Sequence, residues 1–186
     1  NSARGTNVTG SRELVEIFRA AFNTWDNVDT AQMSFVEGPA TSIATAGFDQ
    51  VNLISVMPDQ FSSGALSLTV LYSFSDSGVD QYGRTIEFPG QILEADILFN
   101  PAVQFSTDLT TPANKMDLQA LATHEIGHLL GLDHSGLLSA TMSPASTPGT
   151  STGRTLSSDD IIRISGLYPT SAFFTTRGST QGTVRS

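Results

Sequence analysis

Three histidines stand close together in this sequence, and they are the only histidines among its 186 residues. They lie in the stretch His124-Glu125-Ile126-Gly127-His128-Leu129-Leu130-Gly131-Leu132-Asp133-His134. If this stretch begins as a helix, His124 and His128 project from the same face one turn apart. Two imidazoles placed in this way can bind one Zn²⁺ ion at about 2.0–2.1 Å. The spacing therefore predicts a zinc site.

The rest of the motif predicts a catalytic zinc rather than a structural one. Gly131 lets the chain leave the helix with a positive φ, so that His134 can return to the metal as a third ligand. Three protein ligands leave the fourth position for water, as in catalytic sites. Glu125 follows the first ligand and is predicted to be the general base that activates this water. A chance match to the whole pattern in a chain of this composition has a probability of roughly 10⁻⁶.

Composition narrows the range of partners. A formal net charge of −9 argues against a nucleic acid or an anionic membrane surface. The absence of cysteine excludes disulfides, thiolate ligands and cysteine nucleophiles. No apolar run approaches the roughly 18–20 residues that cross a bilayer, so we expect no membrane insertion. The acidic chain fits a secreted, extracellular microbial protein, and its opening Asn1-Ser2-Ala3, without Met, is typical of a processed product.

Three helices are predicted from hydrophobic spacing. An apolar stripe predicts the first over about 11–25, with Ser11 as its N-cap. The second runs from about Asp117 to Leu130 and carries the zinc motif. The third opens with the capping pattern at 157–160.

Strands are predicted between the first two helices. Three stretches are rich in apolar and β-branched residues: 51–56, 65–74 and 97–99. The acidic stretch 75–90 is expected to form a hairpin or loop, because it contains several Gly and Asp residues.

The zinc motif resembles that of the metzincin metallopeptidases, and Ser135 after the third histidine resembles the matrixin branch. Ala140-Thr141-Met142-Ser143-Pro144 is similar to the matrixin Met-turn, in which Met142 would form an apolar floor beneath the zinc. Similarity extends over about 14–169, with further matches at 21–25, 95–99 and 156–168. The chain thus resembles a bacterial secreted member of the matrixin family.

The resemblance implies an α+β metzincin/matrixin-like catalytic domain. Its expected features are a twisted five-stranded mixed sheet, mostly parallel with one antiparallel edge strand, three helices and an active-site cleft. We assign the edge strand to 65–74, along which an extended substrate would pair main chain to main chain. An apolar pocket beside the zinc would be walled by Pro144, Ala145 and Ser146. Residues 1–170 would form the catalytic domain and 171–186 a C-terminal tail or linker.

The implied activity is that of a monomeric, zinc-dependent endopeptidase acting on extended protein or peptide substrates, with the extracellular matrix as a setting. A zinc-bound water activated by Glu125 would hydrolyse the peptide bond. The alternative is a catalytically silent zinc-containing interaction or adhesion module, but such a protein would most easily have lost Glu125 or a ligand. A zinc enzyme with another substrate class is the third interpretation, and no nucleotide or phosphate motif supports it.

Several positions depart from the family pattern. Ser143 and Ser146 stand where matrixins usually have tyrosines, which affects the specificity of the pocket. The structural zinc of the vertebrate enzymes needs three more histidines, so it cannot exist here in its usual form. The first sheet strand normally precedes the first helix. With about ten residues before Ser11, this strand is either short, trimmed or replaced by the tail.

Two acidic groups have open interpretations. Asp76, Asp80 and Asp96 could bind Ca²⁺, but a solvated acidic loop is the simpler interpretation, because no spaced calcium motif is present. Asp159 and Asp160 would brace the Met-turn in the family, whereas an acidic helix start explains them without such a role.

Overall fold

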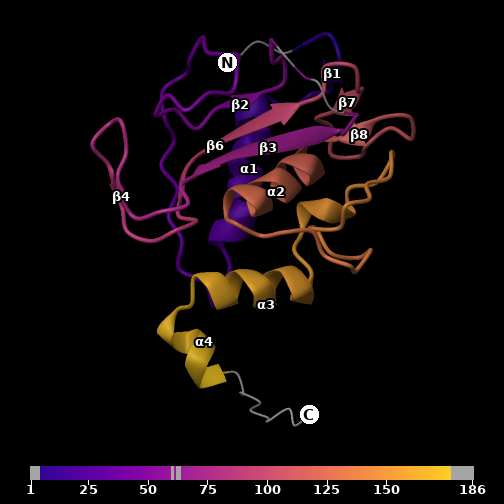
Figure 1. Ribbon diagram of the computed structural model, residues 1–186. Coiled ribbons are helices and arrows are strands. Elements are labelled where there is room, and N and C mark those ends of the chain that lie inside the picture. The colour runs from indigo at the N-terminus through magenta and orange to yellow at the C-terminus, as the bar shows by residue number, and fades with distance from the viewer. Residues whose placement is uncertain (1–4, 60, 62–63, 177–186) are drawn as a thin grey trace, which may run out of the picture.

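The two longest described helices pack against each other (Figure 1). A buried hydrogen bond joins them. Helix α1 spans Leu14–Asp26 and helix α2 spans Leu118–Leu129. The Trp25 indole, fully buried on α1, donates from Nε1 to the Thr123 carbonyl of α2 at 2.8 Å. Because the only polar atom of this ring is satisfied, its whole apolar surface can join the core. The structure is a computed structural model that describes residues 5–59, 61 and 64–176.

The start of α1 differs from the prediction. Glu13, not Ser11, holds the N-cap position. The amide and hydroxyl of Ser11 donate instead to Asp108 Oδ1, at 2.9 and 3.1 Å. Ser11 is therefore tied to a distant loop, and its cap assignment was wrong.

One three-stranded sheet carries the predicted edge strand. Its order is β2-β6-β3. The members are β2 (Ile54–Ser55), β6 (Ile92–Phe99) and β3 (Ser67–Ser73). Strand β2 runs parallel to β6 and β3 runs antiparallel to it, so the antiparallel edge strand is confirmed.

The remaining strands are short. A second sheet with the order β1-β7-β8 is entirely parallel. Its members are β1 (Val8–Thr9), β7 (Phe105–Ser106) and β8 (Met116–Asp117). In the 75–90 excursion, β4 (Gly78–Val79) and β5 (Thr85–Ile86) form the predicted hairpin. A short strand, β1, precedes α1, which is one of the three alternatives given for the first strand. A single five-stranded sheet is not confirmed, because the described strands form two three-stranded sheets and one two-stranded hairpin.

The C-terminal part adds helices beyond the three predicted. Helix α3 (Ser158–Leu167) begins with the expected capping box between Ser157 and Asp160. The 3₁₀ helix η1 (Thr152–Arg154) precedes it, and α4 (Ser171–Thr176) follows, projecting away from the remaining elements (Figure 1). The predicted tail is thus helical over 171–176, and its part 177–186 lies outside the described residues. No helix in the described ranges has the length and apolarity needed to cross a membrane.

Candidate metal centre

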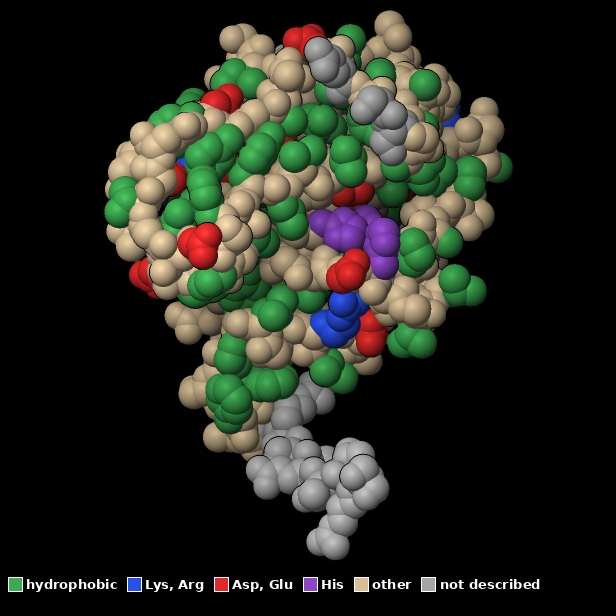
Figure 2. Space-filling view, in the orientation of Figure 1, with side chains coloured by type: hydrophobic (Ala, Val, Ile, Leu, Met, Phe, Trp, Pro, Cys, Tyr) green, Lys and Arg blue, Asp and Glu red, His purple; other side chains and the backbone are tan. Residues whose placement is uncertain are grey.

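The three histidines converge on one point of the surface, where they form a single purple cluster in Figure 2. Nε2 of His128 lies 3.1 Å from Nε2 of His124 and 3.2 Å from Nε2 of His134. Three ligands at the zinc–nitrogen distance in a tetrahedral arrangement would stand about 3.3–3.4 Å apart. Among the described residues, this is the only cluster of three or more His, Cys, Asp or Glu side chains close enough to hold an ion.

The hydrogen bonds of the rings assign their protons and show that a cation fits between them. Nδ1 of His124 lies 2.7 Å from the Thr141 carbonyl, and Nδ1 of His128 lies 2.8 Å from the Leu132 carbonyl. A carbonyl only accepts, so both Nδ1 atoms carry the hydrogen and both Nε2 atoms present lone pairs. Two lone pairs facing each other at 3.1 Å repel unless a cation lies between them. The donor set therefore fits zinc.

Helix α2 ends in a way that turns the chain back toward the metal site. The amide of Gly131 donates to His128 and that of Leu132 to Gly127, both at 2.9 Å. These two bonds form a Schellman motif, with Gly131 at φ +89°. The turn places the Leu132 carbonyl on His128 and directs the chain to His134. The predicted role of Gly131 is confirmed.

The Met-turn residue Met142 packs against helix α2 at Gly127. Met142 is fully buried, and a Cβ added to Gly127 would lie 2.2 Å from its Sδ. Burial lowers the pKa of His124, outweighing the opposing effect of its bond to Thr141, and this favours the neutral imidazole that binds metals.

Asp160 fixes the turn to helix α3. This fully buried carboxylate accepts from the amides of Thr141 and Met142, at 2.8 and 3.1 Å. It also accepts from the amide and hydroxyl of Ser157. Because the Thr141 carbonyl accepts from Nδ1 of His124, Asp160 is connected through Thr141 to the ring whose Nε2 faces the metal site. Of the two interpretations of this residue, the bracing one matches its contacts.

Glu125 lies beside the histidines in the interior of α2, and only 4 % of its surface is exposed. Its carboxylate oxygen Oε2 accepts a hydrogen bond of 2.5 Å from the hydroxyl of Thr69, on the edge strand β3. Thr69 is not among the residues predicted from the sequence. Alternation along the strand groups residues 67, 69 and 71 on one face, but it does not indicate that this face meets α2.

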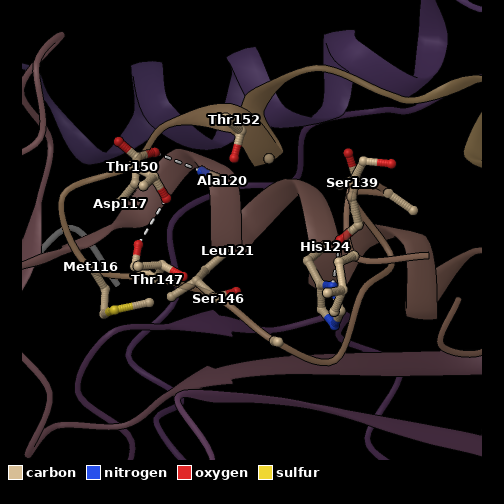
Figure 3. A pocket seen from close by; sticks show the side chains of 15 residues that line it. Met116, Asp117, Ala120, Leu121, His124, Ser139, Ser146, Thr147, Thr150 and Thr152 are labelled. Carbon is tan, nitrogen blue, oxygen red and sulfur yellow. Dashed lines mark hydrogen bonds between the residues drawn. The ribbon is translucent and has the colours of Figure 1, made fainter. Parts of the chain in front are cut away.

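A pocket of about 360 Å³ opens beside His124 (Figure 3). One wall comes from α2 and the residues before it, including Asp117 and Leu121. The other lining residues come from chain segments after the zinc motif: 138–141, 145–147, 150 and 152–153. Ala145 and Ser146 line the pocket, whereas Pro144 does not. The lining is mixed rather than apolar, because several Ser and Thr residues contribute to it.

The candidate calcium ligands do not gather. Asp80 is paired with Arg84 at 2.7 Å. Burial alone would raise the pKa of Asp80, but the hydrogen bonds from Arg84 and the Tyr82 amide outweigh it and hold the pKa below its usual value. Asp96 accepts from two loop amides at 2.9 Å, while Asp76 is exposed and accepts from its neighbour Ser75. Calcium therefore remains a prediction without an assembled ligand set.

Comparisons with known proteins agree with this geometry. The family model for M10 peptidases, described as matrixin, matches residues 74–169. Metalloendoproteinase 4-MMP of Arabidopsis thaliana is 31 % identical over 88 % of the chain and 42 % of its own length. Metalloendoproteinase 1 of Glycine max is 52 % identical over 28 % of the chain and 17 % of its own length. Macrophage metalloelastase of Rattus norvegicus is 32 % identical over 56 % and 23 %, respectively. The chain thus spans about two fifths, or less, of the length of these relatives.

Proposed function

Because the chain belongs to the matrixin family of metallopeptidases, we propose that it is a zinc-dependent endopeptidase acting on extended protein substrates. The observation that carries the proposal is the convergence of three Nε2 atoms, 3.1–3.2 Å apart, beside a buried glutamate. A structural site would close the fourth position with a protein ligand, and no further His, Cys, Asp or Glu joins this cluster within the described ranges.

The chemistry divides between the metal and Glu125. Zinc held by His124, His128 and His134 supplies the Lewis acid that polarises a carbonyl and lowers the pKa of water. Glu125 accepts a proton from the attacking water and delivers it to the leaving amine nitrogen. Its burial keeps competing solvent away from the carboxylate.

Substrate binding uses the sheet and the pocket. One edge of β3 has no partner strand among the described residues, so an extended peptide can add to it through main-chain hydrogen bonds. The residue after the scissile bond would place its side chain in the pocket beside His124. The Ser and Thr lining favours side chains that combine apolar and polar contacts.

We also propose the extent of the catalytic domain, the localisation of the protein and its oligomeric state. Residues 1–170 act as the catalytic domain, and the protein is a secreted, extracellular monomer. The excess of acidic residues and the lack of cysteine support this setting. Detection of the protein in the medium of its source cells, at the mass of one chain, tests it.

The decisive experiment compares the wild type with Glu125→Gln on a quenched peptide, with and without a zinc chelator. The amide keeps the size of the side chain and removes the base, so we expect a fall in rate of at least 10²–10⁴-fold. Glu16→Gln, which removes the same charge from the exposed face of α1, should match the wild type. Hydrolysis that is indifferent to chelation, or unchanged in Glu125→Gln, would refute the proposal. Stoichiometric zinc without hydrolysis would favour the silent binding module.

A further inference from the structure

A single hydroxyl connects the substrate-binding edge strand to the general base. Thr69 lies in the middle of β3, where it pairs with Ile97 of β6. Its Oγ1 stands 2.5 Å from Oε2 of Glu125 and 3.0 Å from the Glu125 carbonyl oxygen. No other hydrogen bond reaches the Glu125 carboxylate from the described residues.

The short contact to Oε2 is the one expected of a charge-assisted bond. A threonine hydroxyl has one hydrogen and can donate it to one acceptor at a time. Bonds from a hydroxyl to a carboxylate are shorter and about twice as strong as bonds between neutral groups. When Glu125 is ionised, the hydrogen of Thr69 therefore points to Oε2.

The same contact serves Glu125 after it has taken a proton from water. That proton rests on Oε1, the oxygen that Thr69 does not contact. Oε2 remains an acceptor, so the hydroxyl of Thr69 can keep donating to it without movement of any heavy atom.

We propose that Thr69 is a positioning residue that holds the Glu125 carboxylate in register with the substrate on β3. The proposal rests on the proposed endopeptidase function. A glutamate has three rotatable side-chain bonds, so an unrestrained carboxylate would sample positions from which it cannot reach the water. Tying Oε2 to β3 leaves Oε1 for the reacting water and fixes it relative to the main chain that the peptide pairs with.

Two variants separate positioning from packing. Thr69→Val keeps the shape and favours the strand, but it lacks the hydroxyl. Thr69→Ser keeps the hydroxyl and loses a methyl group, and it is the poorer strand former. A purely structural role predicts that Val is tolerated better than Ser, whereas positioning predicts the reverse for turnover.

The test measures kcat and KM of zinc-loaded wild type and both variants on one quenched peptide, together with zinc content and unfolding midpoint. For Thr69→Val we expect kcat to fall about 10- to 100-fold, the effect of one hydrogen bond to a charged group. Its KM should stay within about twofold, because β3 keeps its main chain, and zinc content should stay at one equivalent. Thr69→Ser should recover kcat to within about threefold of the wild type.

A crystal structure of Thr69→Val provides a readout that does not depend on activity. The Glu125 carboxylate should occupy more than one rotamer there and a single rotamer in the wild type. An active wild type with Thr69→Val equal to it in kcat, or with the loss confined to KM, overturns the inference and leaves the proposed function intact. A wild type that binds zinc but hydrolyses no peptide overturns both.

Discussion

Replacing Asp160 with asparagine should weaken both the fold and the zinc site, because this carboxylate supports the segment that orients His124. Oδ2 accepts from the Thr141 amide at 2.8 Å and from Ser157, while Oδ1 accepts from the Met142 amide at 3.1 Å. An asparagine has one oxygen in place of two. If its oxygen faces Thr141 and Ser157, its NH₂ group must face the Met142 amide, and two donors oppose each other in a fully buried position.

The expected losses in stability and in zinc affinity follow from these contacts. Loss of a hydrogen bond to a charged group and the burial of an unsatisfied donor each cost about 1–3 kcal/mol, partly offset because a neutral amide is cheaper to bury than a carboxylate. We expect the free energy of unfolding of the metal-free protein to fall by about 2–4 kcal/mol. A residue that orients a metal ligand typically changes metal affinity about 10- to 100-fold. Under zinc, linkage then adds roughly 1.4–2.7 kcal/mol to the loss.

The assay combines urea unfolding, with and without zinc, and a zinc competition titration against a chromophoric chelator. Asp159→Asn is the matched control. It removes the same charge from the same helix turn, and its amide oxygen can still accept the 2.7 Å bond from Ser135. It should lose less than about 1 kcal/mol. Zinc binding by Asp160→Asn as tight as that of the wild type, or equal behaviour of the two variants, would refute this role of Asp160.

Two other perturbations test the packing and the electrostatics. Gly127→Ala should lower the free energy of unfolding by about 1–3 kcal/mol, because the new Cβ would lie 2.2 Å from Met142 Sδ. In contrast, Gly166→Ala on α3, where the Cβ meets nothing within 4 Å, should raise it by about 0.5–1 kcal/mol; equal effects in urea unfolding would contradict this packing. Hydrogen bonds from the Ser11 amide and hydroxyl lower the pKa of Asp108 in the folded state. Its contribution to stability is thus present above the unfolded pKa of about 3.9 and is lost as the pH falls through the folded value. The stability advantage of the wild type over Asp108→Asn should shrink as the pH is lowered from 5 to 2, and an advantage independent of pH would count against it.

The features predictable from the sequence are those specified by local spacing. His124 and His128 share a helix face whatever the surroundings, and Gly131 permits the positive φ with which the helix ends. The capping box at Ser157 is equally local. These signals need no knowledge of distant chain segments, so the zinc cluster, α2 and the start of α3 follow from them.

The features that could not be predicted depend on contacts between distant residues. Thr69 stands 56 positions before Glu125, and nothing in the spacing of a strand shows which helix its face will meet. Ser11 is a residue type that is common at N-caps, but in the structure it donates a hydrogen bond to Asp108, 97 positions away. Asp80 is a residue type that binds calcium, yet it forms an ion pair with Arg84, four residues later.

The most direct test of the account is the hydrolysis of a quenched peptide by metal-free protein as zinc is added stepwise. Activity should be absent without zinc, rise linearly and stop rising at one equivalent, because one set of three histidine nitrogens holds one catalytic ion. In the same titration, Glu125→Gln should bind one equivalent of zinc and stay at least 10²-fold less active. Hydrolysis by the zinc-free protein, or full activity of the glutamine variant, would contradict the account.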